Sequence, residues 1–160
     1  MKSTLEVKVN EFLAQKRIAV AGVSRDRSHH PVGNLIYHRL KDSGHDVFAV
    51  NPNMQTFEGD RCYPDLKSIP DGVGGVVIIT RPETTKQIVE DCYDTGVHHV
   101  WMHEGLPHSA TSVSMEAVTF CREHDINVIA GDCPMMFGTG ADFPHKCMKW
   151  ILRVTGKLPA

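Results

Sequence analysis

The sequence lacks any long run of hydrophobic residues. Its apolar stretches, such as residues 18–23, are far shorter than the roughly 18 residues that a transmembrane helix needs. The N-terminus also lacks the charged, apolar and small-residue pattern of a signal peptide, because Glu6, Lys8 and Asn10 interrupt its apolar positions. These absences predict a cytoplasmic protein with no membrane partner.

The chain has no excess of positive charge and no paired cysteines. Its 17 Lys and Arg residues against 19 Asp and Glu give a formal charge of −2, which excludes a broad basic face for nucleic acid. Neither a C-x-x-C pair nor a typical metal-ligand spacing among the ten histidines is present, so no disulfide framework and no metal site is predicted. Most cysteines are expected to be small buried hydrophobes: Cys62, Cys92, Cys121, Cys133 and Cys147.

What the sequence does contain is a regular alternation of strand and helix patterns. Apolar, β-branched segments begin near residues 18, 47, 76, 99 and 127, and helical periodicity fills most of the intervals, including about 31–43 and 111–124. Residues 65–68 are interpreted as a single helical turn. This rhythm predicts an α/β fold: a doubly wound sheet of about five parallel strands flanked by helices. The 160 residues are expected to form one domain, with an N-terminal helix at about 3–15, a core at about 16–137 and a C-terminal helix at about 144–154.

The first apolar segment ends in Gly22-Val23-Ser24 and is followed by a polar loop and the helix that starts near Pro31. A helix N-terminus after such a turn presents free N–H groups and partial positive charge, which favours a phosphate. Arg25 and Arg27 in the loop add guanidinium groups that match phosphate oxygens. The segment predicts binding of a phosphate-bearing nucleotide, against the alternative of solvated loop charges without a ligand.

The features of an ordinary NAD site are missing. The G-x-G-x-x-G pattern needs three closely spaced glycines, but only Gly22 precedes Gly33. The second strand ends in Asn51 rather than in the acidic residue that accepts a hydrogen bond from a ribose hydroxyl. A dinucleotide-dependent regulator or oxidoreductase is therefore kept as an alternative, not as the preferred interpretation.

A nucleophilic cysteine is a second alternative. Cys133 follows the fifth strand, and His103, at the end of the neighbouring strand, is a candidate base for it. The competing interpretation is a packed thiol in front of Pro134. The sequence leaves both open, as it does a domain that binds no small molecule.

Several short motifs occur in an order that resembles a known family. Gly22-Val23-Ser24, Val50-Asn51-Pro52, Glu58-Gly59 with Cys62-Tyr63, and Ile69-Pro70 resemble the small stand-alone CoA-binding domain proteins. Segments 103–107 and 132–134 look like the corresponding stretches of the CoA-binding domain in the succinyl-CoA synthetase alpha subunit. The resemblance extends over about residues 12–137 and does not include the later domain of the synthetase, so ligase chemistry is not implied.

This resemblance implies a Rossmann-like domain that holds coenzyme A, or an acyl-CoA, across the strand ends. Gly22 and Val23 are expected to bind the cofactor, and the residues expected at its phosphates are Ser24, Arg25, Asp26 and Arg27. Asn51, Pro52 and Asn53 would lie beside the adenosine. Thr80, Arg81 and Pro82 would flank the cofactor, and Met102, His103 and Glu104 would border its distal part.

The preferred hypothesis from the sequence is a CoA-binding protein without catalytic activity of its own, with a role in sensing, carrying or regulation. The alternatives are an NAD(H)-binding regulator or oxidoreductase, a small acyl-CoA-handling enzyme, and a ligand-free interaction domain. No protein partner is predicted.

Overall fold

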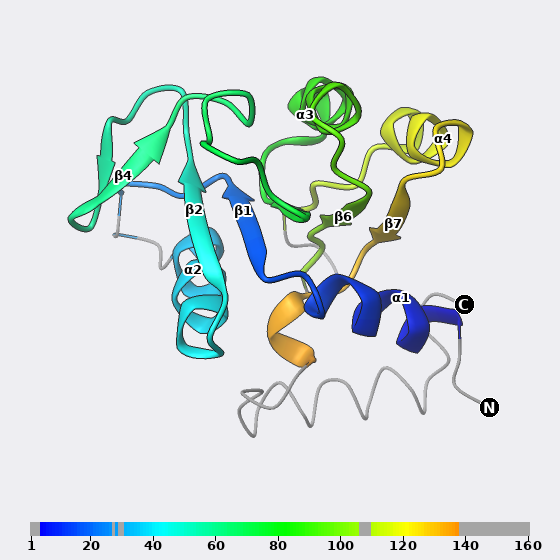
Figure 1. Ribbon diagram of the computed structural model, residues 1–160, viewed down its shortest axis with the longest axis horizontal. Helices are drawn as coiled ribbons and strands as arrows, with labels where there is room; N and C mark the ends of the chain where they lie inside the picture. Colours follow the sequence, from blue (N-terminus) through cyan, green and yellow to red (C-terminus); the bar gives the residue numbers. More distant parts are fainter. Residues whose placement is uncertain (1–3, 27, 29–30, 106–109, 138–160) are drawn as a thin grey trace.

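A computed structural model describes residues 4–26, 28, 31–105 and 110–137 (Figure 1). Its centre is one sheet with the strand order β3-β4-β2-β1-β5-β6-β7. The five predicted strands all form and pair in parallel: β1 (Arg17–Ala21), β2 (Asp46–Val50), β5 (Gly75–Ile78), β6 (His99–Met102) and β7 (Asn127–Ala130). Their β-branched and apolar sequences suit strands that are covered on both faces.

A short hairpin extends the sheet beyond the predicted strands. Its strands are β3 (Thr56–Phe57) and β4 (Asp60–Tyr63), which pair antiparallel, and β4 pairs in parallel with β2. Both residues of the turn between them have positive φ, 50° at Glu58 and 90° at Gly59. The strands themselves were not predicted, because two to four residues are too few to establish a periodicity.

The helices cover both faces of the sheet (Figure 1). On one side lie α1 (Thr4–Leu13), α2 (Val32–Asp42) and the 3₁₀ helix η1 (Pro134–Met136). On the other side lie α3 (Pro82–Asp94) and α4 (Met115–Glu123). Alternate residues of β1 serve the two cores, since Ile18 and Val20 pack with the first group while Ala19 and Ala21 pack with the second. The predicted doubly wound fold is confirmed.

Three local predictions need correction. The predicted helix at 111–124 begins only at Met115, because Thr111 forms a β-bridge with Glu104 and the Ser114 hydroxyl caps the helix by accepting from the Ala117 N–H. Residues 65–68 form no helix; Asp65 Oδ1 instead accepts hydrogen bonds from the backbone and hydroxyl of Ser68. Pro31 is the N-cap of α2 and not its first helical residue.

Other predictions depend on segments outside the described residues. They include the C-terminal helix at about 144–154 and, with it, the single domain over 1–160, which stays a prediction. The four cysteines within the described residues are free and buried, as expected. None of the helices in the described ranges combines the length and apolarity required to cross a bilayer.

The order of the strands creates a switch point beside β1. From β1 the chain moves to β2 on one side, and it returns on the other side of β1 to form β5. The connections that leave the carboxyl ends of β1 and β5 therefore diverge to opposite faces of the sheet, through α2 and α3. Open α/β sheets bind ligands in the crevice that this divergence leaves.

Candidate functional site

The turn after β1 depends on two glycines, Gly22 and Gly33, which lie farther apart in this chain than the glycines of the classical fingerprint do. Gly22 has φ +123°, and a Cβ at this position would lie 2.8 Å from the Ile79 carbonyl oxygen. A Cβ on Gly33, in the first turn of α2, would lie 2.6 Å from the Gly22 carbonyl oxygen. Real Cβ atoms do not approach backbone this closely, so α2 begins directly against the β1 turn only because both side chains are absent.

The loop that follows is held by hydrogen bonds of its own polar residues. Asn34 Oδ1 accepts from the Ser24 N–H at 2.9 Å, and Asn34 Nδ2 donates to the Ser24 carbonyl at 2.8 Å. Ser24 Oγ accepts from the Asp26 N–H at 3.1 Å, and Asp26 Oδ1 accepts from both the backbone and the hydroxyl of Ser28. The hydrogen bonds from Ser28 lower the pKa of the Asp26 carboxyl. Arg25, between these residues, is exposed.

The end of β2 is tied to the same turn through Asn51. Its Nδ2 donates to the Val23 carbonyl at 2.8 Å, and its Oδ1 accepts from the Asn53 N–H at 2.8 Å. Asn51 therefore stands at the position where a nicotinamide-dinucleotide site has its acid, but its amide joins two loops of the protein. An aspartate could not make both contacts, because a carboxylate has no hydrogen to donate.

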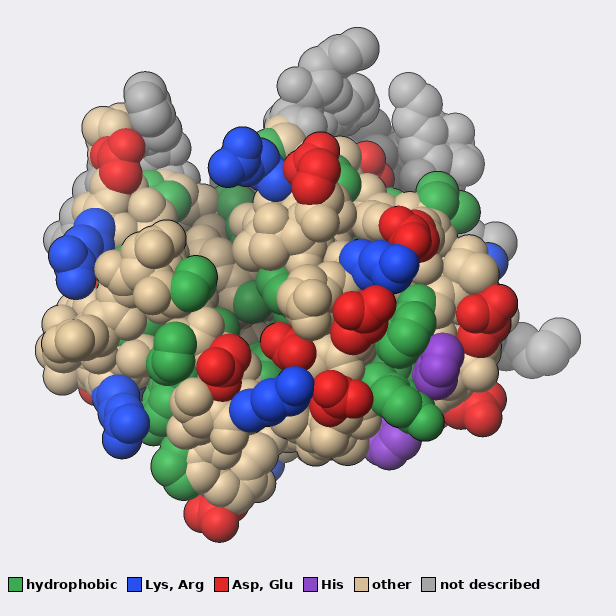
Figure 2. Space-filling view, turned by 90° about the horizontal axis from the view of Figure 1, so that it is seen from above, with side chains coloured by type: hydrophobic (Ala, Val, Ile, Leu, Met, Phe, Trp, Pro, Cys, Tyr) green, Lys and Arg blue, Asp and Glu red, His purple; other side chains and the backbone are tan. Residues whose placement is uncertain are grey.

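A cavity of about 340 Å³ opens between these strand ends and α3, within the range of about 300–1,000 Å³ usual for ligand pockets. Its walls are formed by Ala21, Gly22, Val50, Asn51, Pro52, Asn53, Pro64, Asp65, Leu66, Thr80, Thr84, Gln87, Ile88 and Asp91. Figure 2, which faces the side with α3 and α4, shows a hollow with apolar side chains in its depth and charged ones around it. The hydroxyl oxygen of Thr80 is buried at this cavity and has no hydrogen-bond partner in the structure.

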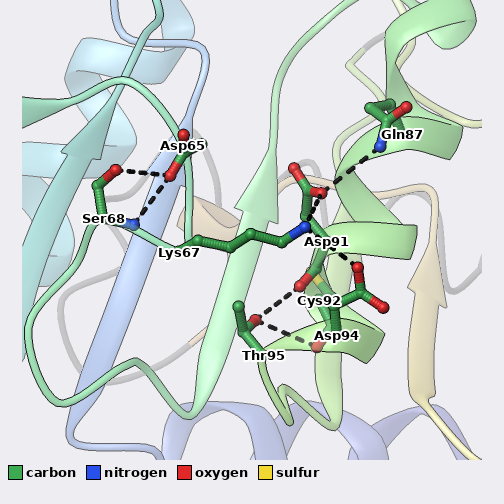
Figure 3. Close-up of polar contacts among 8 residues, drawn as sticks. All are labelled: Asp65, Lys67, Ser68, Gln87, Asp91, Cys92, Asp94 and Thr95. Carbon is green, nitrogen blue, oxygen red and sulfur yellow. Dashed lines mark hydrogen bonds and ion pairs between the residues drawn. The ribbon is translucent and has the colours of Figure 1, made fainter.

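One wall of this cavity is fixed by a contact between the loop after β4 and α3 (Figure 3). Lys67 Nζ lies 3.4 Å from Asp91 Oδ1 and 3.1 Å from Asp94 Oδ2, and these contacts raise the pKa of Lys67. Asp65, on the same loop, accepts from Ser68. Both carboxylates of the cavity wall, Asp65 and Asp91, thus already have partners within the protein.

The structure brings three of the four predicted strand ends together at this cavity. Gly22, Asn51, Pro52, Asn53 and Thr80 line it, and Val23, Ser24 and Asp26 form the adjoining turn and loop. Arg27 lies outside the described residues. Arg81 is the exposed N-cap of α3, and Pro82 is its first residue.

The fourth predicted group does not line the cavity. Met102 and His103 are buried at the end of β6, where the His103 N–H donates to the Ile78 carbonyl, while Glu104 is exposed. Burial lowers the pKa of His103 to about 4, so the imidazole is neutral and is a weak base. Cys133 is also buried, with 4% of its surface exposed. Within the described ranges no three His, Cys, Asp or Glu side chains gather as a metal site.

The sequence did not indicate the site residues that come from the helices and from the loop after β4. The helical residues are Asn34, Thr84, Gln87 and Ile88, which are spread along helical patterns. Only Asn34 could have been noticed in the sequence, because it is a polar residue among core positions. Their role follows from the packing of α2 and α3 against the strand ends.

Comparisons with known proteins show the family of this chain. The family model described as a CoA binding domain matches residues 16–139. The chain belongs to this family. It is 28% identical over 136 residues to the uncharacterized protein YneT of Bacillus subtilis, covering 83% of this chain and 93% of that protein. A solved structure of a hypothetical protein from Pyrococcus horikoshii has a TM-score of 0.73 and 27% identity, covering 84% of this chain and 94% of that one.

A further relative is a much longer enzyme. The chain is 27% identical over 128 residues to the ADP-forming acetate–CoA ligase I of Archaeoglobus fulgidus, covering 78% of this chain and 18% of the ligase. The shared part is therefore a CoA-binding domain, and the rest of the ligase has no counterpart in these 128 residues.

The residues at the switch point fit the cofactor of the family. The turn at Gly22 packs against the Ile79 backbone too closely for any side chain, and Thr80 offers a buried hydroxyl that has no partner among the described residues. Within the described residues no side chain caps the N-terminus of α2, in contrast to that of α4. A glycine turn, an uncapped helix and a polar group inside an apolar cavity are what a nucleotide with a diphosphate requires.

Proposed function

We propose that this protein binds coenzyme A, free or acylated, at the switch point between β1 and β5. The observation that carries the proposal is the cavity formed by Gly22, the Asn51–Asn53 turn and Thr80, in a chain that belongs to the CoA-binding domain family. The adenosine occupies this cavity, where Pro52 and Ile88 offer apolar surface and the Thr80 hydroxyl offers a hydrogen bond.

The diphosphate of the cofactor lies outside the cavity, against the Gly22–Asp26 turn and the N-terminus of α2. The free N–H groups and the dipole of this helix favour negative charge, and Arg25 supplies an exposed guanidinium with no ion pair in the described part of the chain. The pantetheine arm then passes Thr80, Arg81 and Pro82 in the direction of β6.

The amide of Asn51 favours this cofactor over a nicotinamide dinucleotide. The amide nitrogen donates to the Val23 carbonyl, and the amide oxygen accepts from the Asn53 N–H. The neutral amide also lacks the negative charge that would accept hydrogen bonds from two ribose hydroxyls. A dinucleotide would have to bind without the acidic anchor that its usual site provides.

The role of the bound cofactor is the finer part of the proposal. We infer a role in sensing, carrying or regulation, in which the occupied domain is recognised by another protein.

The test is isothermal titration calorimetry of the purified chain with CoA, acetyl-CoA and NADH, after mass spectrometry of any molecule that co-purifies. We expect CoA or acetyl-CoA to bind and NADH to bind far more weakly. Replacing Arg25 and Arg27 together by alanine should weaken CoA binding by about 1–3 kcal/mol, the contribution of charged hydrogen bonds to phosphate. Tight binding of NADH without binding of CoA would overturn the proposal, and an unchanged affinity in the double variant would remove the phosphates from this loop.

A further inference from the structure

A second cavity lies next to the one at the switch point. It has a volume of about 610 Å³ and lies between the 52–55 segment and β4. Its walls are formed by Pro52, Asn53, Met54, Gln55, Arg61, Cys62 and Pro64. Pro52, Asn53 and Pro64 also line the first cavity, so the two cavities adjoin each other at these residues.

The charge of this second cavity differs from that of the first. Its lining contains the cation Arg61 and no carboxylate, whereas Asp65 and Asp91 lie in the first cavity. The Arg61 guanidinium is 4.9 Å from the centre of the Tyr63 ring, a contact that holds it in place without neutralising it. No ion pair of Arg61 occurs within the described residues.

The pleat of β4 explains why Arg61 stays unpaired. Successive residues of a strand point to opposite faces, so Asp60 is directed away from Arg61. Asp60 instead accepts from Tyr37 at 2.8 Å and pairs with Lys41, both on α2. The acid of the preceding turn is also turned to α2, since Glu58 lies 2.7 Å from His38. The two acids of the hairpin therefore contact α2, whereas Arg61 lines the cavity.

We propose that the second cavity binds a phosphomonoester on the ribose of the nucleotide, with Arg61 as its ligand. This proposal depends on the proposed function, and it names the chemical group by which the site selects its nucleotide. Coenzyme A carries such a phosphate on its ribose, and dephospho-CoA is the same molecule without it. Guanidinium groups suit a phosphomonoester because they donate two parallel hydrogen bonds to its oxygens.

The experiment compares CoA with dephospho-CoA by calorimetry at fixed ionic strength. We expect the native protein to bind CoA about 10- to 100-fold more tightly, the range for charged hydrogen bonds. Arg61→Gln should bring the two affinities to within about threefold of each other by weakening CoA alone. Arg61→Lys should retain part of the preference, because it keeps the charge without the planar guanidinium. Arg122→Gln, an exposed change on α4, is the matched control and should behave like the native protein.

The outcomes separate this inference from the proposed function. Equal binding of both ligands by the native protein, or an equal loss of both in Arg61→Gln, overturns the phosphomonoester site and leaves CoA binding in place. If neither ligand binds to the native protein, the proposed function fails and the inference fails with it. Far-UV circular dichroism and the thermal midpoint of each variant establish that the loss is not due to unfolding.

Discussion

The side chain of Asn34 is bonded to both backbone polar groups of Ser24. The amide oxygen accepts from the Ser24 N–H at 2.9 Å, and the amide nitrogen donates to the Ser24 carbonyl at 2.8 Å. Asn34 is 6% exposed and belongs to α2, while Ser24 begins the loop after β1. The Asn34 side chain therefore fixes the loop that is proposed to contact the diphosphate. It bonds to the N–H and the carbonyl of one residue, as a neighbouring strand would.

Replacing Asn34 by alanine should release this loop. Two hydrogen bonds are lost, and polar groups of Ser24 lose their partners, so the free energy of unfolding should fall by about 1–3 kcal/mol. The affinity for CoA should fall as well, because the loop must then be ordered on binding. Urea unfolding and calorimetry measure the two effects. Leu35→Ala, at the adjacent and 47% exposed position, is the control and should have little effect on either. An Asn34→Ala protein with native CoA affinity would contradict the role given to this side chain.

Gly33→Ala tests the close approach of α2 to the β1 turn. Helix propensity alone predicts a gain of about 1 kcal/mol from glycine to alanine. The added Cβ would, however, lie 2.6 Å from the Gly22 carbonyl oxygen, so backbone has to move. We expect the second effect to win and the free energy of unfolding to fall by about 1–3 kcal/mol, with weaker CoA binding.

The control for this change is Gly44→Ala, beyond the other end of α2. Gly44 has φ +91° and no atom within 4 Å of the added Cβ, so only backbone strain is introduced there. This variant should lose stability but keep the CoA affinity of the native protein. A more stable Gly33→Ala protein would mean that the turn adapts without cost.

His103 should make the stability of the protein depend on pH. Burial lowers its pKa from 6.5 to about 4, so between these values the unfolded chain binds a proton that the folded chain does not. The free energy of unfolding therefore rises with pH across this window, and the contribution of His103 should fall by about 2 kcal/mol from pH 7 to pH 5.

Urea unfolding of the native protein and of His103→Gln at these two pH values measures the effect. The variant should show a smaller loss between pH 7 and pH 5. His98→Gln, at an exposed position just before β6, should keep the native pH dependence. If the His103→Gln protein lost as much stability between pH 7 and pH 5 as the native protein, His103 would not be the source of the pH dependence. Its pKa in the folded protein would then lie near the ordinary value.

The order of strands and helices was accessible from the sequence because each element carries its own periodicity. β2 forms over Asp46–Val50, as expected from its apolar run between Gly44 and Asn51. Predictions failed where a side chain or a partner segment decides the structure: the Ser114 cap sets the start of α4, and pairing with β2 makes a strand of Asp60–Tyr63. Such contacts join distant positions and leave no local pattern.

The candidate site divides in the same way. The sequence by itself determined the residues at the strand ends, since a buried strand that ends in a turn is a local signal, and Gly22, Asn51 and Thr80 do line one cavity. Only the tertiary structure decided which other groups reach it. Asn34 comes from the face of α2, and Arg61 comes from a hairpin whose alternation turns Asp60 to α2 and leaves the arginine at the second cavity. Whether an arginine at a cavity is neutralised depends on whether the nearby acids form ion pairs with other residues. Those ion pairs depend on packing between segments that are far apart in the chain.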